Sequence, residues 1–380
     1  MYSEDYLASI VDKYDRENVS DDDLIELIIS IAKSGDIFDI PDYAYDFAST
    51  GGPSSLSTLL VPLYIYGNGL NVVNLAVPGR PAGAVDVLAQ IPNYDLNTNK
   101  LRGERHSNFY IHLAASERFV PLDKQLFEYR KEHNKVNVPN LVIASILSKK
   151  LASGAKAIGL DVRMSSFGNF GNSWADSMML SQKYNRLASI LGIKSTCFIS
   201  NANYPYQKYI GRGESLLALY ELFFGQADEW LQSHALYCRK MAETMINDKN
   251  NTFGKSSELV ECFSKNLETQ GSSLKYFKEA VTRIMSEPRQ IVSAQSNGFV
   301  HYDLRVIRDV IVQQQMKSNS SLQYPDPCGV ILLCKPGEYV YEGQSVFSAR
   351  FQDPSVIGQL QKAFSTNQQA EEPDLRIEVI

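Results

Sequence analysis

The feature of this sequence that most limits its fold is an alternation of helix-like and strand-like segments. Residues 139–153 are helical in pattern and end at Gly154, and residues 157–162 follow as a short run of buried-type residues. A second helix begins after Ser173, where Asp176 completes a capping box, and it ends at Gly192 before the strand-like residues 195–200. Strands that alternate with helices form parallel βαβ units, because a parallel connection needs a crossover. We therefore predict an α/β fold.

The two ends of the chain have a different character. Residues 1–35 predict two short helices, and residues 214–285 are mostly helical in pattern. Residues 329–334 and 339–347 are typical of antiparallel β hairpins, which predicts a small α+β domain at the C-terminal end. A chain of 380 residues with 44% hydrophobic residues has enough apolar material for more than one core.

Composition excludes several classes of partner. The chain has 37 Lys and Arg against 43 Asp and Glu, so its net charge of -6 argues against a nucleic acid polymer or an anionic membrane. Its apolar stretches are far shorter than the roughly 20 residues that span a bilayer, so we expect no membrane segment and no signal peptide. The five cysteines and five histidines show neither Cys-x-x-Cys nor His-Glu-x-x-His spacing. We expect a cytoplasmic protein without a disulfide scaffold, a metal or another cofactor.

One candidate site is the glycine-rich stretch from Ser49 to Ser55. Glycines let the backbone approach an anion, hydroxyls donate to it, and the start of the following helix presents N–H groups. No Gly-x-x-x-x-Gly-Lys is present, so the stretch is not a nucleotide-triphosphate loop. By itself a Gly-Gly-Pro turn is more often a plain connection.

A second candidate lies on the helix of residues 139–153. Ser145 and Lys149 are four residues apart and share one face of an otherwise apolar helix, and Arg130 precedes that helix. A guanidinium, a hydroxyl and an ammonium together suit a flat ligand with carbonyl oxygens, such as a pyrimidine. The alternative, favoured by spacing alone, is a solvated helix face.

Several motifs resemble those of thymidine and pyrimidine-nucleoside phosphorylases. The similarity runs through nearly the whole chain, and its motifs are the following: Ser49-Thr-Gly-Gly52, Pro78-Gly-Arg80, Asp86-Val-Leu88, Asp123-Lys124, Tyr129-Arg130, Ser145-Ile-Leu-Ser-Lys-Lys150, Leu160-Asp-Val-Arg163 and Lys335-Pro-Gly337. The resemblance implies a pentosyltransferase that cleaves a pyrimidine nucleoside with phosphate as co-substrate, working as a homodimer.

The resemblance also implies a domain division and roles for residues. The expected parts are an α-helical lobe of residues 1–43 and 122–152, an α/β domain of residues 44–121 and 153–290, and a C-terminal α+β domain of residues 291–380. Arg130, Ser145 and Lys149 match residues that hold the pyrimidine, and Arg130 and Lys149 are the expected catalytic pair. The matches to the phosphate cradle are Ser49, Thr50, Gly51, Gly52 and Thr58.

Departures from the family pattern gather on the phosphate side. Where the family has Asp-Lys-His before its Ser-Thr-Gly-Gly, this chain has Asp46, Phe47 and Ala48, so the phosphate-binding lysine and the base-contacting histidine are both absent. The segments 78–84 and 165–169 also differ, and the N-terminal lobe lacks helices that help to build the family's dimer interface. Three functions remain open: a divergent phosphorylase, a hydrolase or transferase that uses another acceptor, and a catalytically impaired nucleoside-binding partner protein.

Overall fold

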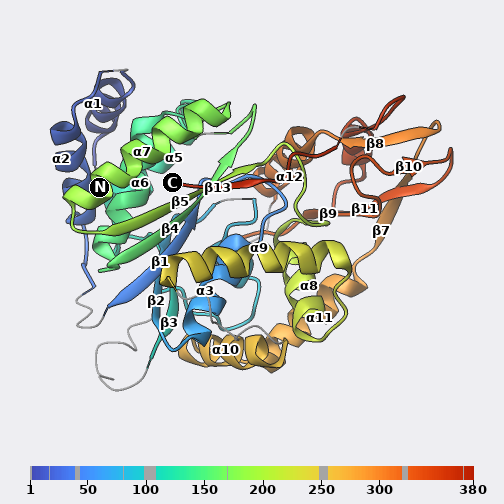
Figure 1. Ribbon diagram of the computed structural model, residues 1–380, viewed down its shortest axis with the longest axis horizontal. Coiled ribbons are helices and arrows are strands. Elements are labelled where there is room, and N and C mark those ends of the chain that lie inside the picture. Colours follow the sequence, from blue (N-terminus) through green and yellow to red (C-terminus); the bar gives the residue numbers. More distant parts are fainter. Residues whose placement is uncertain are drawn as a thin grey trace.

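A mixed α/β architecture organises the chain. The computed structural model describes residues 2–16, 18–38, 43–79, 81–97, 108–168, 170–247, 256–318, 324–370 and 372–380. A main unit contains a large sheet with helices on both faces, and a smaller unit of strands and helices lies at one end of it (Figure 1). The prediction of an α/β fold with a further C-terminal α+β part is confirmed.

The central sheet of the main unit has six strands in the order β13-β5-β4-β1-β2-β3. Its strands are β1 (Ala44–Ser49), β2 (Asn71–Ala76), β3 (Tyr110–Ala114), β4 (Ala157–Met164), β5 (Lys194–Asn201) and β13 (Ile377–Val379). The first five are parallel, and β13 pairs antiparallel with β5 at the edge. Every residue of β4 is buried, because helices cover both faces of a parallel sheet.

Two hydrophobic cores lie on the two faces of this sheet. One face carries α1 (Glu4–Tyr14), α2 (Asp21–Ala32), α5 (Pro121–Glu132), α6 (Pro139–Ala152) and α7 (Trp174–Ile190). The other carries α3 (Ser57–Gly67), α4 (Ala84–Leu88), α8 (Arg212–Phe223), α9 (Glu229–Ile246), α10 (Ser256–Thr269) and α11 (Leu274–Ser286). The helices of the expected N-terminal lobe share their core with residues of the sheet, and the division into lobes stays a prediction.

The C-terminal unit is built from two small antiparallel sheets and two helices. Its elements are β7 (Arg289–Ser293), β8 (Gly298–Tyr302), α12 (Leu304–Lys317), β9 (Cys328–Leu332), β10 (Tyr339–Val340), β11 (Ser345–Phe351), the 3-10 turn η2 (Pro354–Val356), α13 (Ile357–Gln361) and β12 (Phe364–Asn367). One sheet has the order β10-β8-β12, and the other has the order β6-β9-β11-β7. In the second of these sheets, strand β6 (Tyr209–Ile210) comes from the main unit.

The predicted hairpins of this unit need a correction. Residues 339–347 do not form one strand that pairs with residues 329–334. β11 pairs with β9, whereas β10 pairs with β8 in the other sheet. Gly343, with a φ of 85°, lies in the turn between β10 and β11. Local pattern showed antiparallel strands, but their partners depend on β8, which lies far away in the sequence.

A buried ion cluster joins the two units. Glu214 on α8 is fully buried and accepts two hydrogen bonds from Arg350 on β11, each 3.0 Å long. Arg289 on β7 donates a third at 2.8 Å. Arg350 also pairs with Asp326 at 2.7 Å, and burial raises the pKa of that carboxyl to about 6. The cluster holds the C-terminal unit against α8.

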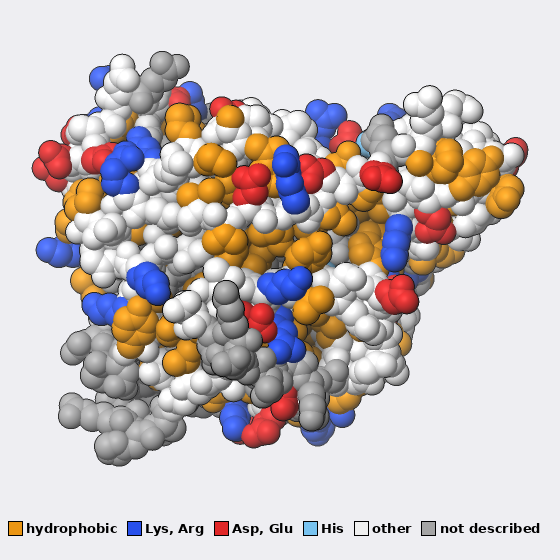
Figure 2. All heavy atoms as spheres, viewed as in Figure 1, with side chains coloured by type: hydrophobic (Ala, Val, Ile, Leu, Met, Phe, Trp, Pro, Cys, Tyr) orange, Lys and Arg blue, Asp and Glu red, His pale blue; other side chains and the backbone are white. Residues whose placement is uncertain are grey.

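The surface of the molecule is mixed in charge. Figure 2 shows Lys, Arg, Asp and Glu side chains scattered over the visible face, with hydrophobic side chains gathered on the C-terminal unit. Tyr339 and Tyr341 are among the exposed apolar residues there, with ring centroids 5.4 Å apart. Among the helices of the described ranges, none has the length and hydrophobicity to cross a membrane. All five cysteines are buried free thiols.

Candidate functional site

The candidate site lies where the strand order of the main sheet reverses. From β1 the chain proceeds to β2 and β3 on one side, while β4 and β5 lie on the other side of β1. The connection after β1 leads to α3 on one face, and the connection after β4 leads to α7 on the opposite face. Loops that leave neighbouring strands in this way open a crevice beyond their carboxyl ends, which is where open α/β sheets bind ligands.

A cavity of about 540 Å³ occupies this crevice. Its walls come from the loop after β1, the loop after β2, α5, α6, the loop after β4, and α12 of the C-terminal unit. All eight residues that the sequence assigned to a site line it: Ser49, Thr50, Gly51, Gly52, Thr58, Arg130, Ser145 and Lys149. The structure therefore brings together two motifs that are about eighty residues apart in the chain.

The glycine-rich loop after β1 is shaped by hydrogen bonds to its own hydroxyls. Gly51 and Gly52 have φ angles of 100° and 119°, which L side chains rarely adopt. Ser49 Oγ accepts from the Gly51 N–H at 3.2 Å, and Thr50 Oγ1 accepts from the Arg163 N–H at 2.9 Å. A Cβ on Gly51 would meet no atom within 4 Å, so this glycine faces open space. The loop exposes backbone to the cavity, as an anion site requires.

Buried side chains fix the start of α3 behind this loop. Asp161 on β4 accepts from Ser57 Oγ at 2.7 Å and from Ser200 Oγ at 2.9 Å. The Leu56 N–H donates to His234 Nε2 at 2.8 Å, and this ring is 3% exposed. Burial, and secondarily Arg163, lowers the pKa of His234 to about 3, so its ring is neutral and accepts this hydrogen bond. Asp161 and His234 therefore bind groups at the N-terminal end of α3, where the sequence suggested that an anion would bind.

The opposite wall carries an ammonium group with fixed partners. Lys149 Nζ lies 2.7 Å from Asp123 Oδ2 and 2.8 Å from Ser145 Oγ, and it also donates to the Ser145 carbonyl. Lys149 is 5% exposed and Asp123 is 1% exposed. Ser145 and Lys149 do share one face of α6, as the four-residue spacing predicts, and that face lines the cavity. The alternative of a solvated helix face is wrong.

Arg130 lies in the same wall but directs its guanidinium to the backbone. Its Nε donates to the Lys135 carbonyl at 3.0 Å, and its terminal nitrogens donate to the carbonyls of Val136 at 2.6 Å and Leu141 at 3.5 Å. Arg130 is 2% exposed. In this structure it holds the segment between α5 and α6 in place. Its expected contact with a pyrimidine stays a prediction.

A second buried ion pair connects the two walls. Lys150, the neighbour of Lys149, places its Nζ 2.7 Å from Asp46 Oδ2 on β1, and both side chains are at most 2% exposed. Asn74 donates to Asp46 Oδ1 at 2.9 Å. Burial raises the pKa of Asp46, and Lys150 opposes that rise. The pair links α6 directly to the strand that ends in the glycine-rich loop.

Phe47 and Ala48 stand where the resemblance led us to expect lysine and histidine. Phe47 is fully buried and its ring centroid lies 6.2 Å from that of Phe198, in the core beneath α3. A Cβ on Gly159 would come within 2.5 Å of the Phe47 ring, so a glycine on β4 makes room for this ring. Ala48 packs against the core of the other face, since neighbouring strand residues point to opposite faces.

Sequence reasoning missed several residues of this site. Asp123 was noted only as part of a motif, while Asp46 and Lys150 carried no predicted role. The signal was available, because charged residues within apolar segments need partners when they are buried. The contribution of Arg308 and Asp309 on α12 has no local signal and depends on how the C-terminal unit packs. Arg80 and Asn169, within the divergent segments, lie outside the described residues.

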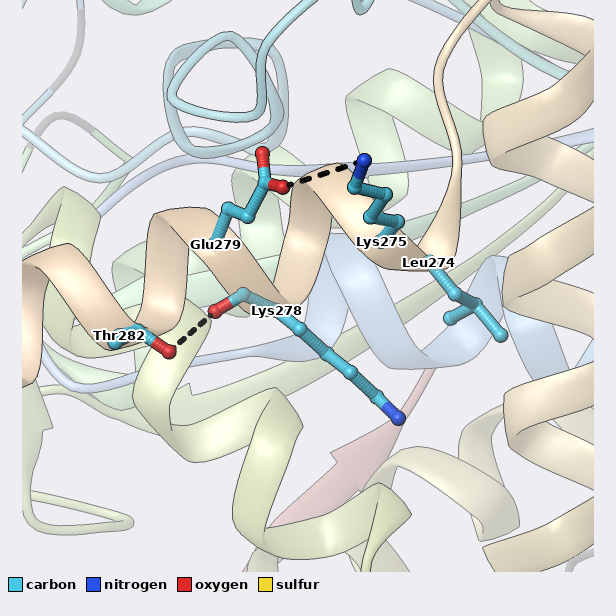
Figure 3. A pocket seen from close by; sticks show the side chains of 5 residues that line it. All are labelled: Leu274, Lys275, Lys278, Glu279 and Thr282. Carbon is cyan, nitrogen blue, oxygen red and sulfur yellow. Dashed lines mark hydrogen bonds and ion pairs between the residues drawn. The ribbon is translucent and has the colours of Figure 1, made fainter.

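A separate depression on α11 is shallow and exposed (Figure 3). Figure 3 shows Lys275 and Glu279 directed toward one another and Lys278 directed away from them. The Lys275 to Glu279 ion pair is 3.9 Å long, with side chains 80% and 53% exposed. Exposed pairs of this kind contribute about 0–1 kcal/mol. None of the predicted site residues lies here.

Sequence comparison finds distant relatives in the family that the motifs resemble. No family model matches the chain. The pyrimidine-nucleoside phosphorylase of Staphylococcus aureus strain USA300 is 25% identical over 357 residues, covering 87% of this chain and 81% of the relative. The phosphorylase of strain bovine RF122 / ET3-1 is 24% identical over the same length. The chain is a distant homologue of these phosphorylases. This homology supports a pentosyltransferase type of function.

Two solved structures align with the chain at low similarity. Anthranilate phosphoribosyltransferase from Saccharomyces cerevisiae has a TM-score of 0.45 and 9% identity, covering 74% of this chain and 92% of its own. Anthranilate phosphoribosyltransferase from Thermus thermophilus has a TM-score of 0.44 and 12% identity, covering 75% of this chain and 97% of its own.

Proposed function

We propose that this protein is a pentosyltransferase that cleaves the N-glycosidic bond of a pyrimidine nucleoside with phosphate as the acceptor. One observation carries the proposal: the residues expected to hold the base and those expected to hold phosphate line one cavity. The distant homology to pyrimidine-nucleoside phosphorylases over 87% of the chain supports the same reaction.

The two walls divide the chemistry. The ammonium of Lys149 and the hydroxyl of Ser145 form the base wall, where they offset the negative charge that develops on a departing pyrimidine. The Ser49 to Thr58 wall presents backbone and hydroxyl groups to a phosphate dianion, which attacks C1′ as the glycosidic bond breaks. Holding both partners in one cavity supplies the proximity that this displacement needs.

Lys149 is prepared for this task by its neighbours. Asp123 and Ser145 fix the position of the ammonium group, so little reorganisation is needed when charge develops on the base. In this proposal Arg130 acts mainly through the segment 135–141 that it supports, and Ser145, whose Oγ accepts from Lys149, donates its own O–H to the base. The aliphatic residues Val142 and Ile146 on the same face of α6 supply apolar surface for the ring.

The reaction is tested by incubating the purified full chain with thymidine, uridine and deoxyuridine, with and without phosphate, and measuring free base by chromatography. We expect base release that requires phosphate and yields pentose 1-phosphate. Release without phosphate would instead show a hydrolase. Nucleoside binding by calorimetry without any release would show a binding protein, and absence of both binding and release would reject a nucleoside as ligand.

A matched pair of variants tests the base wall. Ser145→Ala removes a hydroxyl beside Lys149, while Ser148→Ala removes a buried hydroxyl from the same helix that donates to the Ser145 carbonyl and does not line the cavity. We expect Ser145→Ala to lower kcat/KM for the nucleoside about tenfold without changing the KM for phosphate. Ser148→Ala should stay within about threefold of the parent chain. Equal effects of the two changes would contradict the assignment of the base wall.

A further inference from the structure

The glycine-rich loop carries no cation of its own. No lysine or arginine occurs between Ser49 and Thr58, and the strand position where we expected a lysine is the buried Phe47. Hydrogen bonds from backbone amides alone bind a phosphate dianion weakly in water, so a phosphate site normally includes a positive charge. The structure places one directly behind the loop.

Arg163, near the end of β4, holds the loop at both of its ends. Its backbone N–H donates to Thr50 Oγ1 at 2.9 Å, and its Nη2 donates to the Pro53 carbonyl at 3.3 Å. The guanidinium lies 4.7 Å from the centroid of the Tyr206 ring, which fixes its plane. The ends of the Thr50 to Pro53 turn are therefore set by one residue.

The Arg163 guanidinium has donor capacity left over. The side chain is 2% exposed, and its Nε has no hydrogen-bond partner among the described residues. This Nε lies 3.6 Å from the place that a Cβ on Gly52 would take, so it faces the loop. An unpaired donor on a buried charge is unfavourable unless a negative charge comes near it.

The surrounding charges leave Arg163 without a direct counterion. Asp161 is the near carboxylate, and it reaches Arg163 through Ser200, whose Oγ accepts from Arg163 Nη1 at 3.2 Å and donates to Asp161 Oδ1. Asp161 is also engaged by the hydroxyl of Ser57. Within the described ranges, no carboxylate lies within ion-pair distance of Arg163.

We propose that Arg163 is the positioning residue and the positive charge of the anion site, with a phosphate dianion bound on the cavity side of the Gly51–Gly52 turn. The proposal rests on the proposed function and names the group that replaces the absent lysine. Arg163 acts through the loop: it orients the turn with its hydrogen bonds and lowers the electrostatic energy of an anion on the other side of Gly52. Glycine is required there because a side chain would separate the two charges.

The test compares two variants of similar size that differ in charge, Arg163→Lys and Arg163→Gln, with inorganic phosphate as the probe. Calorimetry gives the Kd of phosphate, and steady-state kinetics give separate KM values for phosphate and nucleoside. We expect Arg163→Gln to weaken phosphate about tenfold or more and Arg163→Lys clearly less, with the nucleoside KM within about threefold in both. A merely structural role would change both KM values together.

Arg186→Met is the control for net charge, because Arg186 is an exposed arginine on α7 whose partner is Asp21. It should leave the phosphate Kd within about twofold. Equal phosphate affinity of Arg163→Lys and Arg163→Gln would overturn the proposal. Should neither variant fold, Tyr206→Leu decides: it leaves the charge in place but removes the ring that orients it, and unchanged phosphate affinity would then overturn the proposal.

The outcomes separate this inference from the proposed function. Phosphate-dependent base release by the parent chain, together with unchanged phosphate binding in Arg163→Gln, refutes the role of Arg163 alone. Loss of phosphate binding in Arg163→Gln, together with a parent chain that releases no base, supports the anion site and refutes the reaction.

Discussion

The buried pair of Asp46 and Lys150 is the most informative single contact to perturb, because it joins the two walls of the cavity. Lys150→Met removes the ammonium and keeps most of the apolar stem. The two charged atoms are 2.7 Å apart, with side chains 2% and 0% exposed, so the carboxylate that remains is buried without its counterion. Breaking a buried pair in this way costs about 3–5 kcal/mol. That is a large part of the roughly 5–15 kcal/mol that is typical of a folded domain.

The assay is urea unfolding followed by the fluorescence of tryptophan, since Trp174 packs against the core beside α6. The double variant Asp46→Asn with Lys150→Met removes the charge as well as its partner. We expect it to recover more than half of the lost free energy of unfolding, because a neutral amide is much easier to bury. A loss below about 1 kcal/mol in the single variant, or no recovery in the double variant, would refute this reasoning.

The same variant has a defined dependence on pH. Burial already raises the pKa of Asp46, and loss of Lys150 raises it further. The folded variant then binds a proton at pH values where the unfolded chain, with a pKa of about 3.9, does not. Its free energy of unfolding therefore increases as the pH falls toward about 4, and its deficit relative to the parent chain narrows. A deficit that is constant between about pH 7 and pH 5 would show that the charge of Asp46 is not its cause.

Three further changes test other parts of the structure. The pKa of His234 is about 3 in the folded chain and about 6.5 in the unfolded chain, so unfolding takes up a proton when the pH is below 6.5. The free energy of unfolding of the parent chain therefore falls by up to about 1.4 kcal/mol for each pH unit below 6.5. Thermal unfolding of His234→Gln between about pH 7 and pH 5 should lack this slope. Gly51→Ala and Gly192→Ala both put alanine at positive φ with no steric contact, so each should lower stability by about 1–2 kcal/mol, but only Gly51→Ala should raise the KM for phosphate. Gly329→Ala would place a Cβ in steric overlap with the Glu214 carboxylate of the buried ion cluster and should prevent soluble expression, whereas Gly358→Ala meets no atom within 4 Å and should express like the parent chain.

Local sequence signals were sufficient for most of the elements. The capping box predicted at Ser173 is present, with Ser173 accepting from the Asp176 N–H, and Ser20 caps α2 in the same way by accepting from the Asp23 N–H. Residues 157–162 lie within β4, and the helix predicted from residue 139 begins at Pro139. These features depend on contacts within one or two turns of chain, which is why a single sequence reveals them. The resemblance added which distant segments belong to one site.

Contacts between residues that lie far apart in the sequence could be predicted less well. The sequence placed Arg130 beside the base, but its hydrogen-bond geometry depends on where the carbonyls of residues 135–141 lie. The burial of the Phe47 ring, which also lines the cavity, depends on Phe198 and on the space that Gly159 leaves on the neighbouring strand. The return of β13 to the central sheet follows from no local pattern, because three residues carry too little periodicity to name a partner strand.

The sequence by itself therefore determined the α/β class, the boundaries of its main helices and strands, and the residue types available for an anion and a flat polar ring. Those properties are encoded by periodicity, caps and glycines over short distances. Only the tertiary structure decided that Arg163 lies behind the Gly51–Gly52 turn and that Asp123 and Ser145 hold Lys149. The position of a buried charge depends on every element that packs around it, and those elements come from all parts of the chain.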